Sequence, residues 1–246
     1  MHQPANESPI AKAHFDRAAP APHRPAWLLP SGLFAACTVF VLATFWLVTS
    51  LDIPFVVLTR DAAIAYTKDA PFYGGYLSNL GALFWCAAAA VALFTALVLR
   101  PITPGRREMR FFLFSGGLLS AILLIDDLFM LHDGALYACA GRGQNTTLLF
   151  QALFTIWFLW RFRRLILQQT RWSLLSIALL CFAASLFVDM VDLGIPQHVH
   201  HLYEEGPKLI GIVNWCVYFV YSSACAMNPR FQHGELATEA ASPPHH

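Results

Sequence analysis

The chain has 246 residues and a formal net charge of +1; 57% of its residues are hydrophobic and only 13% are charged, and the mean hydropathy is +0.52. This composition excludes an ordinary soluble domain and predicts an all-α integral membrane protein, whose first partner is the lipid bilayer. The near-zero charge and the lack of a dense Lys/Arg cluster exclude nucleic acid as a partner.

Six apolar runs are expected to cross the bilayer as helices, since each spanning helix needs about 20 apolar residues. They cover approximately 27–50, 78–99, 111–131, 146–160, 172–193 and 204–226, within one transmembrane domain over residues 27–226. The Pro- and Ala-rich residues 1–26 and the polar residues 227–246 are predicted to be disordered tails. The first run is too long for the apolar part of a cleavable signal peptide.

The distribution of Lys and Arg predicts the orientation of these spans. The N-terminal tail has three, and the second and fourth loops have four each, whereas the first, third and fifth loops have two, one and none. Because positive residues are retained on the cytoplasmic side, six spans with both termini cytoplasmic are expected. The C-terminal tail, with one Arg, is the weakest match. The short loops suit a bacterial inner membrane.

Two adjacent carboxylates, Asp126 and Asp127, close the third run, and His132 and Asp133 follow them. A carboxylate inside a membrane helix costs about 2.5–3.5 kcal/mol, so this pair needs protein partners, water or a bound cation. The fifth run ends in Asp189 and Asp192, and a polar stretch precedes or opens the sixth: His198, His200, His201, Glu204, Glu205 and Lys208. In the expected topology all three segments reach the extracytoplasmic face.

The start of the sixth helix decides how these residues are presented. If the helix begins near Pro196, then His198, His201, Glu205 and Lys208 form one stripe. If it begins near Glu204, Pro207 falls in its first turn and the histidines belong to a loop. The sequence leaves both open.

Asp, Glu and His side chains with little sulfur are typical ligands of a divalent metal such as Zn, Fe, Mn or Cu. The residues predicted to bind metal are Asp126, Asp127, His132, His201, Glu204 and Glu205. Asp189, as a ligand or general base, and Lys208, as a stabiliser of a developing anion, are the predicted catalytic residues. The first hypothesis is therefore a metal-dependent membrane enzyme with hydrolytic or oxidative chemistry on a lipid-like substrate.

Two alternatives remain open. The same carboxylates could form a proton or cation relay in a carrier or in an accessory membrane subunit without chemistry, although no inverted repeat of three spans supports a carrier. The acids could also be solvated at the headgroup level, with Glu204 or Glu205 pairing only with Lys208 at helical spacing. For Asp133, Asp192 and His198 the solvated alternative is favoured. His and carboxylate atoms that converge at ligand distance in a closed pocket would favour the metal site, and a water-filled path across the bilayer would favour transport. Diverging side chains at a solvated rim would favour the solvated alternative.

Overall fold

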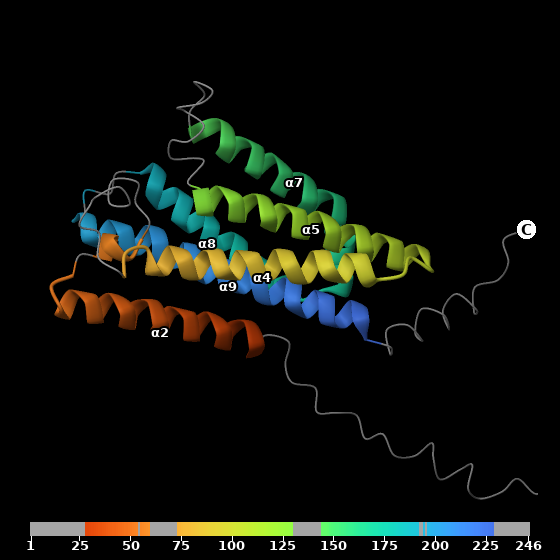
Figure 1. Cartoon of the computed structure of the whole chain (residues 1–246), viewed down its shortest axis with the longest axis horizontal. Helices are drawn as coiled ribbons and strands as arrows, with labels where there is room; N and C mark the ends of the chain where they lie inside the picture. The colour runs from red at the N-terminus through yellow and green to blue at the C-terminus, as the bar shows by residue number, and fades with distance from the viewer. Residues whose placement is uncertain are drawn as a thin grey trace, which may run out of the picture.

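The computed structural model describes residues 28–53, 55–59, 73–129, 144–191, 194 and 196–228. These residues form six α-helices and one short 3-10 helix (Figure 1), and within them the predicted all-α fold class is confirmed. The elements are α2 (Leu28–Ser50), η1 (Phe55–Leu58), α4 (Tyr76–Val98), α5 (Pro104–Phe129), α7 (Gln144–Gln169), α8 (Trp172–Met190) and α9 (Gln197–Met227). Both predicted tails lie outside the described residues, apart from the two residues 227–228.

Among the described residues, five helices, α2, α4, α5, α8 and α9, are long and apolar enough to cross a membrane. The helix that matches the predicted fourth span is α7, which carries Arg161, Arg163 and Arg164 within its length and does not reach the same apolar content. The described chain starts in α2 and finishes after α9 at the same end of the bundle (Figure 1). The exact six-span topology and the cytoplasmic termini stay predictions.

The centre of the bundle is α9. Its most apolar 18-residue window is 72% buried, against 11% for that of α2, and α9 contacts α8, α4 and α2. The core around it is aromatic: the ring of Trp215 lies 5.9 Å from that of Trp85 on α4, and Phe219 stacks at 5.9 Å on Phe112 of α5. Aromatic rings at such distances contribute packing beyond their buried area.

Small residues let neighbouring backbones come close enough for these rings to fill the space between helices. A Cβ on Gly211 of α9 would lie 2.6 Å from the ring of Phe182 on α8, and one on Gly117 of α5 would lie 2.7 Å from Leu93 of α4. Gly116 faces the ring of Phe219 even more closely. Each of these positions is therefore restricted to glycine by tertiary packing.

The buried indole and phenol near the core have polar partners, as buried donors require. Nε1 of Trp215 donates to Oγ of Ser120 on α5 at 2.8 Å. Further along α9, the hydroxyl of Tyr218 lies 3.0 Å from Oγ1 of Thr170, directly after α7. These contacts set the rotation of α9 relative to α5 and α7.

The structure resolves the start of the last helix in favour of the earlier position. Helix α9 begins at Gln197, with Pro196 as its N-cap residue, so the histidines belong to the helix and Pro207 lies inside it. The spacing of three and four residues puts His201, Glu205 and Lys208 on one face. The end of α5, the end of α8 and the start of α9 lie at the same end of the bundle (Figure 1).

Candidate functional site

A lysine held between two carboxylates forms the centre of the site. Lys208 of α9 places Nζ 3.4 Å from Oδ1 of Asp127, near the end of α5, and 3.8 Å from Oε1 of Glu205, one turn earlier on α9. The two carboxylates are mostly buried, with exposed side-chain fractions of 11% and 18%. A buried charge needs a partner of opposite sign. The ammonium of Lys208 is that partner for two carboxylates, one from α5 and one from α9.

Two histidines and a glutamate form a second group on the same part of α9. Oε2 of Glu204 lies 3.4 Å from Nδ1 of His201 and 3.8 Å from Nδ1 of His200. Nε2 of His201 is buried and has no hydrogen-bond partner among the described residues. A carboxylate beside Nδ1 favours the tautomer with its proton there, which leaves a lone pair on Nε2. His201 therefore presents a buried acceptor nitrogen.

Glu204 links the two groups electrostatically, since its carboxylate lies within Coulomb range of Glu205, Lys208 and Asp189. Asp189, in the last turn of α8, is exposed. We call this set the polar cluster; its members are Asp127, Asp189, His200, His201, Glu204, Glu205 and Lys208. The structure thus brings the ends of α5 and α8 and the start of α9 into one electrostatic neighbourhood.

Helix α4 closes one side of the polar cluster through Gly81. A Cβ at this position would lie 3.2 Å from Cδ1 of Ile212 and 3.8 Å from Oδ2 of Asp127. The missing side chain allows the α4 backbone to approach Ile212 of α9, and the Asp127 carboxylate lies at ordinary contact distance beside it. This contact contributes to the low exposure of Asp127.

Two further predicted ligands have different outcomes. Asp126 is buried, with 6% of its surface exposed, directly beside Asp127 in α5. His132 falls in residues 130–143, outside the described part of the chain, as does Asp133; Asp192 and the side chain of His198 are also outside it. The structure therefore shows Asp126 buried next to a member of the polar cluster in the sequence of α5, and it leaves the position of His132 untested.

A metal centre is not assembled by the described side chains alone. Within residues 28–228, leaving out the undescribed gaps, no group of three or more His, Cys, Asp or Glu is placed to hold a metal ion. The ammonium of Lys208 also stands beside Asp127 and Glu205, where it would repel a divalent cation. The divalent metal and its six predicted ligands stay predictions.

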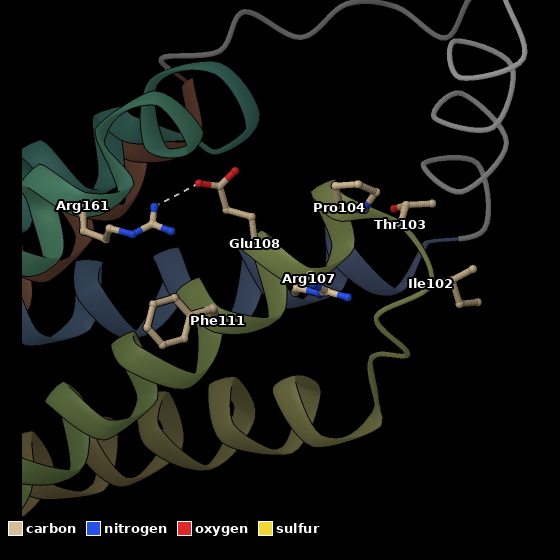
Figure 2. Close-up of a pocket in the computed structure, with 7 residues that line it drawn as sticks. All are labelled: Ile102, Thr103, Pro104, Arg107, Glu108, Phe111 and Arg161. Atoms are coloured by element: carbon tan, nitrogen blue, oxygen red, sulfur yellow. Dashed lines mark hydrogen bonds and ion pairs between the residues drawn. The ribbon is translucent and has the colours of Figure 1, made fainter. Parts of the chain in front are cut away.

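The opposite end of the bundle holds a charged contact that the sequence analysis missed. Nη1 of Arg161 on α7 lies 3.1 Å from Oε1 of Glu108 on α5 (Figure 2). The available signal was Glu108 itself, a single acid among Arg106, Arg107 and Arg110. One acid in a basic segment indicates a specific cationic partner elsewhere.

No curated protein and no solved structure matches the chain. A family model described as "Domain of unknown function (DUF8692)" matches residues 32–222, which extend from α2 into α9. The match includes all the helices that contribute to the polar cluster and spans most of the sequence. The chain therefore belongs to the DUF8692 family.

Proposed function

We propose that the polar cluster is a proton-exchanging relay, used by a proton- or cation-coupled membrane carrier or by an accessory membrane subunit. The observation that carries this proposal is the position of Lys208 between Asp127 and Glu205, at 3.4 and 3.8 Å. All three residues belong to helices that are long and apolar enough to span a membrane. Ionisable groups in such helices typically mark proton and ion pathways.

The charge balance explains why this group would exchange a proton. One ammonium neutralises one carboxylate, so an excess negative charge remains when Asp127, Glu205 and Lys208 are all ionised. A proton taken up by either carboxylate removes that excess and leaves Lys208 to pair with the other. Since Asp127 belongs to α5 and Glu205 to α9, the position of the proton changes the attraction between these helices.

Pro207 supports a response of α9 to that change. It lies inside α9 and has no backbone N–H, so the carbonyl of Tyr203 lacks its usual partner within the helix. Locally weakened helices beside polar groups are common at the binding sites of membrane transporters. The weakened turn contains Glu204 and Glu205, two members of the polar cluster.

Infrared difference spectroscopy of the purified protein, recorded across a pH titration, tests the relay directly. We expect a protonated carboxyl band that is absent or displaced in Asp127→Asn and in Glu205→Gln. Asp52→Asn is the matched control, because Asp52 is an exposed acid in the turn after α2 and asparagine tolerates its φ of 54°. Identical spectra for wild type and both cluster variants would refute proton exchange at this site.

Reconstitution in liposomes separates a carrier from an accessory subunit. With a pH-sensitive dye inside and an imposed membrane potential, a carrier moves protons or a coupled cation faster than protein-free liposomes do, and Asp127→Asn abolishes the difference. An accessory subunit titrates in the infrared experiment but leaves the flux at the protein-free level.

A second candidate, the metal-dependent enzyme, is favoured by His201. An imidazole whose Nδ1 faces a carboxylate and whose buried Nε2 is free of partners among the described residues resembles a metal ligand oriented by an acid. In this candidate His201 binds the ion and Glu204 orients it, with Asp189 or His132 supplying further ligands. Elemental analysis after dialysis against a weak chelator tests it: near-stoichiometric metal in the wild type must be lost in His201→Ala. A wild type without metal after reloading refutes it.

A further inference from the structure

A groove of about 660 Å³ opens between the first turns of α5 and the C-terminal half of α7, at the end of the bundle opposite to the polar cluster. Figure 2 shows its lining, which combines charged with apolar side chains. The lining residues are Ile102, Thr103, Pro104, Arg107, Glu108, Phe111 and Arg161. The groove is open to the outside of the bundle, where lipid would surround a membrane protein.

The charge of the groove is positive. Arg107 and Arg161 line it from α5 and α7, and among the described residues that line it Glu108 is the one carboxylate. Glu108 contacts Nη1 of Arg161 at 3.1 Å and thereby uses only part of the five N–H donors of the guanidinium. The ring of Phe111, 5.8 Å from the same guanidinium, adds a second support for its position. The α5 N-terminus contributes the positive end of the helix dipole.

The position of the groove along the bundle indicates which kind of anion it would meet, a lipid headgroup. All eight arginines of the described residues lie at this end, within α5, within α7 or in the connections next to them; they are Arg100, Arg106, Arg107, Arg110, Arg161, Arg163, Arg164 and Arg171. Arginines gathered at one end of apolar helices are expected at the level of the cytoplasmic headgroups. Anionic lipids of that leaflet attract basic side chains.

We infer that this groove binds the phosphate of an anionic glycerophospholipid, with Arg161 contacting the phosphate, Arg107 adding its positive charge to the lining, and Ile102 and Phe111 contacting the acyl part. Guanidinium groups suit phosphate because their planar N–H donors can contact two of its oxygens. The apolar side of the lining favours a lipid over free phosphate, because a free ion would leave the exposed surface of Ile102 and the exposed part of the Phe111 ring uncovered. Glu108 holds Arg161 at the groove and leaves the site net positive.

Native mass spectrometry of the full chain in detergent, titrated with phosphatidylglycerol or phosphatidylcholine, tests this inference. We expect the wild type to retain phosphatidylglycerol preferentially, and Arg107→Gln and Arg161→Gln each to weaken its first binding step about fivefold. Arg163→Gln is the matched control. Arg163 belongs to the same helix but sits over the ring of Trp160 at 4.4 Å and does not line the groove. This variant should bind the lipid as the wild type does.

Several outcomes would overturn the inference. Equal retention of both lipids by the wild type, or an equal loss in Arg163→Gln, would show binding by the general positive charge of this end. Displacement of the lipid by excess inorganic phosphate would show a site for the free anion instead. Arg107→Gln leaves the ion pair between Arg161 and Glu108 in place, so its result decides the question even if Arg161→Gln does not fold.

Discussion

Lys208 is the residue on which the polar cluster depends, because it compensates Asp127 and Glu205 at once. Lys208→Met keeps much of the side-chain volume but leaves both carboxylates without this cation. We expect it to lower the free energy of unfolding by about 1–3 kcal/mol, the usual cost of a buried polar group left unpaired. Thermal unfolding in detergent measures this effect.

The control for this substitution is Lys208→Arg, which retains the charge and should unfold close to the wild type. The double variant Asp127→Asn, Lys208→Met should recover part of the loss, because it removes one of the uncompensated carboxylates together with the cation. Additive losses for the two substitutions would show that the pair does not interact in the folded protein.

At the residue scale, the sequence predicts which residues form the site better than it predicts which of them contact one another. The contacts of His201 with Glu204 and of Lys208 with Glu205 follow from a spacing of three residues on a helix. The contact of Lys208 with Asp127 joins residues 81 positions apart. It depends on how α5 and α9 are rotated about their axes, which the packing of the whole bundle determines.

At the scale of elements, glycines at helix contacts should be intolerant of even one methyl group. A Cβ on Gly116 of α5 would overlap the ring of Phe219 on α9 and lie 3.3 Å from Phe158 of α7. We expect Gly116→Ala to lower the free energy of unfolding by about 1–3 kcal/mol, because overpacking outweighs the gain of up to about 1 kcal/mol from better helix propensity. Thermal unfolding in detergent measures the difference.

Gly32→Ala provides the control, since a Cβ at Gly32 in α2 has nothing within 4 Å. This variant should unfold at the wild-type temperature or slightly above it. A drop in stability of equal size in both variants would contradict the packing explanation and point to a general effect of replacing helical glycine.

Helix existence could be predicted from apolar runs, but helix length could not. The run beginning near residue 111 predicts a span from there, whereas α5 begins at Pro104. Proline suits the first turn of a helix, and Oγ1 of Thr103 accepts a hydrogen bond from the N–H of Arg106 at 3.3 Å. Capping therefore lets the helix begin before the apolar run. The helix then includes arginines that a prediction from hydropathy excludes. For α9 the sequence left two starting points open, and the helix begins at the earlier one, Gln197.

At the scale of the whole molecule, charge is segregated along the bundle. The eight arginines of the described residues lie at one end together with Glu108, and the polar cluster lies at the other. Arg110 stabilises the arginine-rich end by donating from Nε to the carbonyl of Ala96, in the last turn of α4, at 2.9 Å. This asymmetry is the structural counterpart of the loop charges that predict the orientation.

The orientation and the number of spans can be tested together with reporter fusions placed after residues 101, 143, 171 and 228, using alkaline phosphatase, active outside the cytoplasm, and a fluorescent protein that folds inside. If α7 spans the membrane beside α5 and α8, only the fusion after 143 should report the extracytoplasmic side.

The apolar content of α7 is the weakest of the long helices, because Arg161, Arg163 and Arg164 lie within it. Those arginines follow about 17 residues of the helix and can reach the cytoplasmic headgroups, so α7 can still span. If the fusions after 143 and 171 report the same side, α7 does not span and the six-span topology is wrong. If the fusions after 101 and 228 report the extracytoplasmic side, the orientation is reversed and the arginine-lined groove faces the wrong leaflet for the proposed lipid.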